Sequence, residues 1–263
     1  MCRKLFLLVT VVLLLALAVP ASAADYWLPG DWNGWQTGDP NGTQMTEGPA
    51  GEWSVTVTGL DPGSRQLFKL YESEMETWSP GENSWLYADS EGAVTVGYNT
   101  NVVSDGWLTD QYRISLSTDG NDVGWVIAGS FAWSDNPEMP GGAGYTDWST
   151  TAMPMAAQGG GIYALSLHLP VGGGPSWAGN DNGTPGYDTY GWKTVVTGSS
   201  TWDSIGIDGR GVNTANAFVV VSAGMEDWTF YVDSYTGVVQ AVPEPATIAL
   251  LGLGGLALLR RKR

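Results

Sequence analysis

Cysteine and histidine, two residue types that carry much of metal and nucleophilic chemistry, are almost absent from this chain. Its 263 residues include one cysteine, Cys2, and one histidine, His168. Cys2 lies in an N-terminal apolar segment, so the rest of the chain has no disulfide, thiolate metal site or cysteine nucleophile. Without a second histidine, zinc sites and Ser-His or Cys-His nucleophilic sites are not expected. We therefore predict no metal and no cofactor, and we expect His168 on the polar face of a strand.

Positive charge is also scarce. The chain has 11 Lys and Arg against 27 Asp and Glu, a formal net charge of −16. Six of the cations lie in the terminal segments, so residues 25–241 carry 5 cations and 26 acids. Nucleic acid is excluded as a partner, and so is attraction to anionic lipid by charge alone, because both need Lys and Arg. The balance indicates a soluble, self-repelling exported protein or an acidic surface that captures cations.

The residues that are abundant favour strands over helices. Charged residues make up 14% of the chain, there are 37 glycines, and the 14 tryptophans outnumber the 5 phenylalanines. A helical bundle needs many Ala, Leu, Glu and Lys residues, whereas short strands joined by Gly-, Asn- and Asp-rich turns have this composition. Apolar and polar residues alternate at 53–57 and 165–169, which predicts strands with one buried face. Turn motifs recur about every 8–12 residues, a spacing typical of antiparallel sandwiches.

The first 24 residues have the three parts of a secretory signal. Arg3 and Lys4 precede an apolar stretch at 5–19, and Ala21-Ser22-Ala23 is a small-residue cleavage site. We predict a signal peptide at 1–24 and export of the remainder.

Residues 242–263 combine a short motif, an apolar run and a basic end. The motif is Pro243-Glu244-Pro245, the run spans 246–259, and the basic end begins with Arg260 and Arg261. As a helix the run measures about 21 Å, somewhat short for a bilayer, although snorkelling of Arg260 would extend it. This tail resembles the PEP-CTERM sorting signal of Gram-negative bacteria. The resemblance implies processing by an exosortase membrane enzyme, a transmembrane sorting helix until then, and a biofilm or exopolysaccharide setting; the alternative is a plain C-terminal anchor.

The remaining residues contain two copies of one pattern. Residues 26–35 align with 125–133, 51–57 with 161–167, 66–70 with 190–195, and Trp78 with Trp202. The predicted domains are therefore 25–120 and 121–240, joined by a turn-like segment at 118–122. The second copy has Gly-rich insertions at 135–151 and 172–190, and long loops of this kind are functional or mobile.

Four motifs of the first copy occur in the order of a known family. They are G-D-W-N-G-W at 30–35, G-x-W at 51–53, D-P-G at 61–63, and Phe68-Lys69. In this order they resemble the early-set, Ig-like carbohydrate-binding modules of starch- and glycogen-active proteins. The resemblance covers most of 26–103 and is weaker for 124–221. It implies an all-β fold of two tandem Ig-like (early-set) antiparallel β-sandwiches.

In that family the sugar is held by two Trp residues, one Lys and one Asn. In the first copy these fall on Trp35, Lys69, Trp78 and either Asn99 or Asn101. In the second copy they fall on Trp133, Lys193, Trp202 and either Asn213 or Asn216. An exposed indole stacks on the apolar face of a pyranose while Lys or Asn satisfies its hydroxyl rim, and tandem sites gain avidity. The second set departs more from the family because its first motif, at 129–133, lacks the Asn.

Other residues have less specific patterns. Tryptophans in strand patterns are expected in the core: Trp27, Trp53, Trp107, Trp125, Trp192 and Trp228. Trp177, in a polar loop, is an unaligned candidate for sugar contact. Carboxylates beside a strand edge, at 72, 74 and 76, are weak candidates for a glycosidase, which needs a converging pair. An Asn/Asp-rich stretch at 180–188 contains oxygen ligands for calcium without a spacing that enforces a site.

Together these features predict a non-catalytic, exported protein of the cell surface or biofilm matrix that binds polysaccharide, either an α-glucan-like chain or an exopolysaccharide. Its other expected partners are the exosortase and, through 246–259, the membrane before processing. The alternative is a structural matrix protein that uses the sandwiches as spacers, with the rings of Trp35 and Trp78 packed under their neighbours.

Overall fold

The computed structural model of this protein describes residues 25–49, 51–101, 113–118, 124–131, 147–172 and 189–244. The one helical element within them is a 3-10 turn, η1 (Asp31–Asn33), and the other regular elements are strands. The predicted signal peptide and the predicted helix at 246–259 lie outside these residues. Among the residues described, no helix is long and apolar enough to cross a membrane.

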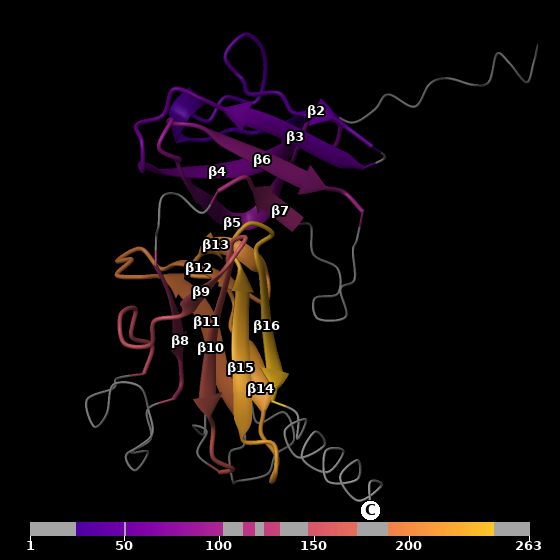
Figure 1. Cartoon of the computed structure of the whole chain (residues 1–263). Coiled ribbons are helices and arrows are strands. Elements are labelled where there is room, and N and C mark those ends of the chain that lie inside the picture. The colour runs from indigo at the N-terminus through magenta and orange to yellow at the C-terminus, as the bar shows by residue number, and fades with distance from the viewer. Residues whose placement is uncertain are drawn as a thin grey trace, which may run out of the picture.

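The N-terminal part, residues 25–118, forms two antiparallel sheets (Figure 1). The β4 sheet has the strand order β1 (Tyr26–Trp27), β4 (Arg65–Glu72) and β5 (Thr77–Tyr87). The β6 sheet has the order β2 (Thr46–Glu47), β3 (Glu52–Val57), β6 (Val94–Asn99) and β7 (Arg113–Leu116).

The C-terminal part, residues 124–244, also forms two antiparallel sheets. The β11 sheet has the order β13 (Gly209–Val212), β12 (Asp203–Gly206), β11 (Thr189–Val196) and β14 (Ala217–Val220), and β8 (Trp125–Gly129) also pairs with β11. The β15 sheet has the order β16 (Val238–Pro243), β15 (Asp227–Asp233), β10 (Ile162–His168) and β9 (Ala156–Gly159).

These four sheets correspond to the four blades of a β-propeller, with strands making up 52% of the structure. The prediction of two tandem Ig-like β-sandwiches is therefore wrong. The blades are not consecutive in the sequence, because the chain crosses between the two sheets of each part before either sheet is complete. Apolar–polar alternation identifies a strand and its buried face, but the grouping of strands into sheets depends on long-range pairing that the alternation does not encode.

Two hydrophobic clusters fill the space between paired sheets. Phe68 and Val96 belong to the N-terminal cluster, and Tyr190 and Phe230 to the C-terminal one. The prediction for the strand tryptophans is confirmed where it can be checked: Trp27, Trp53, Trp125, Trp192 and Trp228 are buried. Trp107 lies outside the described residues.

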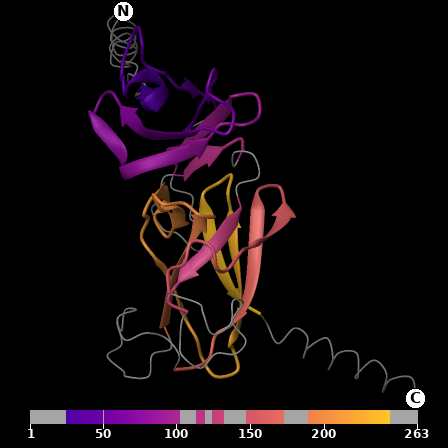
Figure 2. The ribbon, with the colours of Figure 1, turned by 90° about the vertical axis from the view of Figure 1, so that its left-hand side faces the viewer.

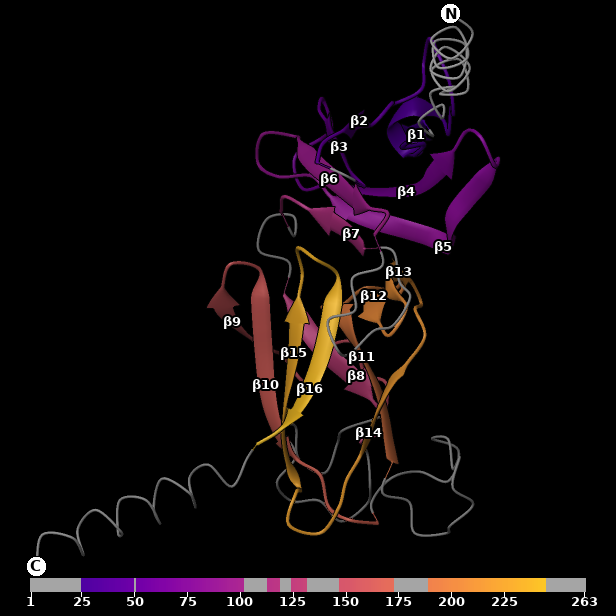
Figure 3. The same ribbon diagram turned by 90° about the vertical axis from the view of Figure 1, so that its right-hand side faces the viewer.

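The two parts are stacked end to end and pack on each other through β5 and β13 (Figures 2 and 3). Trp85 of β5 is fully buried in the cluster of the C-terminal part, with its ring centroid 5.8 Å from that of Trp125. Its Nε1 donates to the carbonyl of Gly211 at 3.0 Å, and the guanidinium of Arg210 lies 4.4 Å from its ring centroid. The N-terminal part therefore contributes a side chain to the core of the C-terminal part.

Candidate functional site

The outer face of the β11 sheet carries a small second cluster that is covered by two indole rings. Val195 of β11 packs there with Val126 and Ala128 of β8, and all three are buried. The half-buried rings of Trp148 and Trp202 pack against them. These two rings explain why β11 is buried along almost its whole length although one of its faces lies outside the main core.

Lys193 places a positive charge between the two rings. Its Nζ lies 5.9 Å from the ring centroid of Trp148 and 5.5 Å from that of Trp202. It donates to Oδ1 of Asn213 at 2.9 Å and to the carbonyl of Thr214 at 2.7 Å, and the residue is only 5% exposed. Burial lowers the pKa of Lys193 below its ordinary value, and the charge of Asp208 opposes this shift. An ammonium has three N–H donors, and these two hydrogen bonds use two of them.

The backbone of this cluster is strained. Trp148, Trp202 and Asn213 have φ values of 62°, 58° and 52°. These are three of the five residues other than glycine with positive φ in the part of the chain that the structure describes. Such conformations are costly for residues with a side chain and gather at binding and active sites. The strain thus marks the same place as the buried ammonium. We call Trp148, Lys193, Trp202 and Asn213 the Lys193 site.

Trp148 occupies the position that Trp35 has in the N-terminal part. Trp35 also has a positive φ, 65°, and its N–H donates to the carbonyl of Gly30 at 3.0 Å. The N–H of Trp148 donates to the carbonyl of Gly129 at the same distance. Gly30 lies opposite Phe68 of β4. Gly129, the last residue of β8, lies opposite Trp192 of β11. The equivalent tryptophan of the second copy is therefore Trp148, which lies near the end of the predicted insertion at 135–151.

Phe218 extends the apolar surface beside Trp148. It lies opposite Gly191 in the pairing of β14 with β11, and its side chain is 50% exposed. A Cβ at Gly191 would lie 3.2 Å from the ring of Phe218 and 3.7 Å from that of Trp148. The missing side chain at Gly191 lets both rings approach the strand, so three aromatic rings lie on one face of the sheet.

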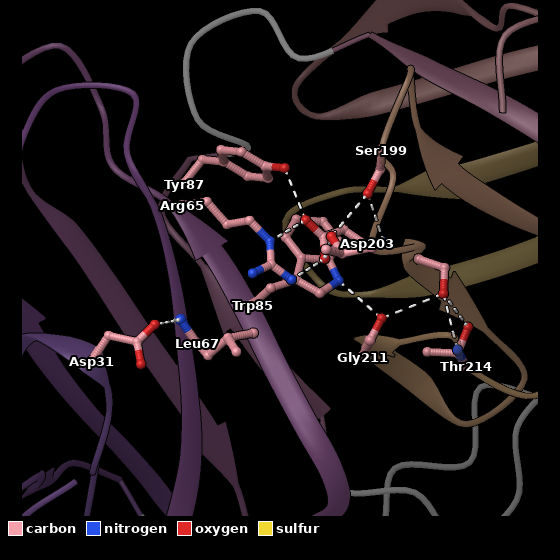
Figure 4. A network of polar contacts seen from close by, with 11 residues as sticks. Asp31, Arg65, Leu67, Trp85, Tyr87, Ser199, Asp203, Gly211 and Thr214 are labelled. Carbon is pink, nitrogen blue, oxygen red and sulfur yellow. Dashed lines mark hydrogen bonds and ion pairs between the residues drawn. The ribbon is translucent and has the colours of Figure 1, made fainter. Parts of the chain in front are cut away.

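Two side chains of the N-terminal part bind Asp203, the residue that follows Trp202. Asp203 is fully buried, and both its oxygens are bound by the guanidinium of Arg65, with Nε to Oδ2 at 2.5 Å (Figure 4). The hydroxyl of Tyr87 donates to Oδ2 of Asp203 at 2.9 Å. The hydrogen bond to Asp203 and the charge of its carboxylate raise the pKa of Arg65 against the opposing effect of burial, and burial together with Asp203 raises the pKa of Tyr87. This contact anchors the segment that carries Trp202 to β4 and β5.

The predicted residues of the first copy are divided between two sheets. Lys69 is half-buried on β4, and Trp78 is 44% exposed on β5, its ring centroid 5.1 Å from that of Tyr71. The half-buried Trp35 donates from Nε1 to Oδ1 of Asp31 at 3.1 Å. Asn99 and Asn101, by contrast, lie at the end of β6, in the other sheet.

The structure brings together Lys193, Trp202 and Asn213 of the second predicted set. Asn216 is half-buried between β13 and β14, and Trp133 lies outside the described residues. Trp148 and Phe218 were missed by the sequence reasoning. Alignment by spacing passes over Trp148 because 16 residues separate it from Phe131, whereas only two residues separate Trp35 from Trp32.

Two residues of the sorting motif continue the fold. Pro243 ends β16 opposite Trp228, and the N–H of Glu244 donates to the carbonyl of Asp227 at 2.7 Å. Pro245, Arg260 and Arg261 lie outside the described residues.

The described residues give little support for a metal site or for histidine chemistry. Among the described residues no group of three or more His, Cys, Asp or Glu side chains is placed to hold a metal ion. The candidate calcium stretch at 180–188 is not among them. His168 is an exposed residue that pairs with Asp227, Nδ1 to Oδ1 at 2.8 Å.

Comparison with known families identifies the C-terminal tail of this chain. Residues 241–263 match the family model described as the PEP-CTERM protein-sorting motif. The motif implies export and a location at the bacterial cell surface or outside the cell, with recognition by an exosortase. No family match supports carbohydrate-binding Ig-like repeats, and no curated protein matches the chain.

Proposed function

We propose that this exported surface protein binds polysaccharide without cleaving it, and that the Lys193 site holds the sugar. The carbohydrate chain would be an α-glucan-like polymer or an exopolysaccharide of a Gram-negative-type bacterium, at the cell surface or in the biofilm matrix. Sorting by exosortase, with residues 246–259 in the membrane until processing, would bring the protein there.

The observation that carries the proposal is a buried ammonium between two indole rings. A pyranose has an apolar face of C–H groups and a rim of hydroxyls, so it is recognised by a flat ring beside a hydrogen-bond donor. Trp148 and Trp202 supply the rings, and Lys193 supplies an N–H donor held at a fixed position by Asn213 and Thr214. Because these groups are already ordered, a sugar would bind without the cost of arranging them.

A structural spacer is the second candidate function. The packing of the two parts through Trp85 and Asp203 favours it, because a rigid connection suits a spacer. The same candidate expected the ring of Trp78 to be packed under its neighbours, and this ring is 44% exposed.

Affinity electrophoresis tests the proposal. The protein would be run through native gels that contain amylopectin, glycogen or extracellular polysaccharide. We expect retardation in at least one gel, loss of retardation for Trp148→Ala and Trp202→Ala, and no change for Met75→Ala, an exposed residue remote from the site. The double variant Trp35→Ala with Trp78→Ala measures how much the N-terminal part contributes to glycan retardation. Absence of retardation in every gel, or retardation that survives Trp148→Ala with Trp202→Ala, contradicts the proposal for the Lys193 site.

A further inference from the structure

The end of the C-terminal part from which the sorting tail leaves presents apolar side chains to solvent. Val171, Val220 and Met225 are 46%, 58% and 47% exposed. They come from three segments: the loop after β10, the last residue of β14, and the loop that leads into β15. We call these three residues the tail-end patch.

Backbone pairing shows that these segments lie at one end of the two sheets (Figure 1). His168 pairs with Asp227, so the loop after β10 lies beside the start of β15, where Leu169 N–H donates to the carbonyl of Glu226 at 2.7 Å. Val220 lies opposite Thr189 in the β11 sheet. The next residue, Tyr190, joins the two sheets by donating its hydroxyl to the carbonyl of Pro170 at 2.6 Å.

The tail leaves from the same end. Pro243, the last residue of β16, lies opposite Trp228 at the start of β15. From Pro243 to the first residue of the apolar run, Ala246, the chain can span at most about 10 Å. With the run in a bilayer, the end of the sheets is therefore held at the membrane surface.

The charges at this end do not attract anionic lipid. Its acids are already engaged: Glu226 accepts from the N–H of Gly224 at 3.0 Å, Asp227 pairs with His168, and Glu244 accepts from the hydroxyl of Thr229 at 2.8 Å. No Lys or Arg lies in the described segments 169–172, 220–227 or 242–244. A contact with lipid here would be apolar, with its strength set by buried apolar area.

We propose that the tail-end patch contacts the bilayer surface while the tail is in the membrane, so that the folded part stands on the membrane with this end down. The inference rests on the membrane insertion of 246–259 that forms part of the proposed function. It adds a second, weaker membrane contact made by the folded part itself.

Single-cysteine labelling tests this contact in the full chain. The sequence has no cysteine besides Cys2, so Cys2→Ser gives a cysteine-free background. Single cysteines at Val171, Met225, Ile162 and Gly252 would each carry a polarity-sensitive fluorophore, in protein reconstituted into phosphatidylcholine vesicles. Ile162 is the matched control: it is also an exposed apolar residue, at the other end of β10, about 20 Å from His168. Circular dichroism would check that each variant folds.

The labels at positions 171 and 225 are expected to shift to shorter emission wavelength and to be quenched by nitroxide-labelled lipid. The label at 162 is expected to stay as in water, and the label at 252 reports on the tail. A water-like signal at both 171 and 225 with a lipid signal at 252 overturns this inference alone. A water-like signal at 252 overturns the membrane insertion of the tail and this inference with it, whereas glycan binding is measured separately.

Discussion

Lys193 is a charged side chain in a buried position. Removing an ammonium from water is costly unless hydrogen bonds and favourable charges compensate. Here Asn213, the carbonyl of Thr214 and two indole rings compensate in part, and the lowered pKa shows that the desolvation is not fully offset. An apolar residue over Val126 and Val195 would avoid that cost, but it would leave the carbonyl of Thr214 without its donor. Under the proposed function, the lysine is accounted for as a donor held in place for a sugar hydroxyl.

Replacing Lys193 with methionine should separate ligand binding from packing. We expect Lys193→Met to abolish retardation by the glycan, because the ring pair keeps its shape but loses the N–H donor. It should also lower the free energy of unfolding by about 1–3 kcal/mol, since Asn213 Oδ1 and the Thr214 carbonyl lose their donor. Affinity electrophoresis and urea denaturation measure the two effects. Unchanged retardation by a folded Lys193→Met protein would remove Lys193 from the site.

The lowered pKa of Lys193 gives binding a pH dependence. As the pH rises through this pKa, which lies below the ordinary value of 10.5, the folded protein loses the ammonium and glycan binding should weaken. In the same window the unfolded chain binds more protons than the folded one, so the contribution of Lys193 to stability rises with pH. Binding should therefore fall before unfolding begins. Electrophoresis and thermal melting at matched alkaline pH values check this order, and binding that stays constant up to pH 10.5 contradicts it.

Part of the site could be predicted from side-chain identity and spacing. The resemblance to carbohydrate-binding modules pointed to Lys193, Trp202 and Asn213, which the structure brings into contact. It missed Trp148, because an insertion separates this residue from the motif to which it belongs. It also missed Phe218, whose approach depends on Gly191 in the neighbouring strand. Contacts across strands depend on register, and one sequence gives no measure of register at these positions.

Among the elements, the β12–β13 hairpin positions the partners of Lys193. Oγ of Ser204 accepts a hydrogen bond from the N–H of Thr214 at 3.0 Å, and the N–H of Asn213 donates to the carbonyl of Trp202 at 2.8 Å. The hairpin thereby holds Trp202, Asn213 and Thr214 in one arrangement. It can do so only because Gly206, at the end of β12, leaves room for the chain that returns beside it.

Gly206→Ala should therefore disturb the site without touching a ligand. A Cβ at this position would fall on the carbonyl oxygen of Ala215 and close to Oγ1 of Thr214, so the segment 213–215 must move. We expect destabilisation by about 1–3 kcal/mol, the usual cost of overpacking, and weaker glycan retardation. Gly38→Ala is the matched control, because a Cβ there meets nothing within 4 Å. Equal stability of the two variants in urea would show that the hairpin tolerates the displacement.

The strands themselves were largely predictable, and their assembly was not. Alternation at 53–57 predicted a strand with one buried face, and β3 has Trp53 and Val57 buried with Ser54 and Thr56 exposed. β11 does not alternate in burial, because Trp148 and Trp202 cover its outer face. The four-sheet arrangement escaped prediction for a related reason, since crossings between sheets are decided by contacts distant in sequence.

At the scale of the whole molecule, the two parts are joined by Trp85, which inserts into the core of the C-terminal part. Trp85→Ala should cost about 3–5 kcal/mol by leaving a cavity between Trp125 and Gly211. Trp78→Ala on the same strand removes an exposed ring and should change stability by no more than about 0.5 kcal/mol. Chemical denaturation of both variants tests the difference. Similar losses at the two positions would contradict a shared core.

The ion pair of Arg65 with Asp203 should couple the N-terminal part to the Lys193 site. Arg65→Met leaves the buried carboxylate of Asp203 with Tyr87 and Thr201 as donors but no cation, and we expect a loss of about 3–5 kcal/mol. Because Asp203 follows Trp202, glycan retardation should weaken in the same variant. Adding Asp203→Asn removes the uncompensated charge and should restore part of both properties, which a double-mutant cycle measures. If Arg65→Met lowers stability but leaves retardation intact, the N-terminal part stabilises the fold without positioning Trp202.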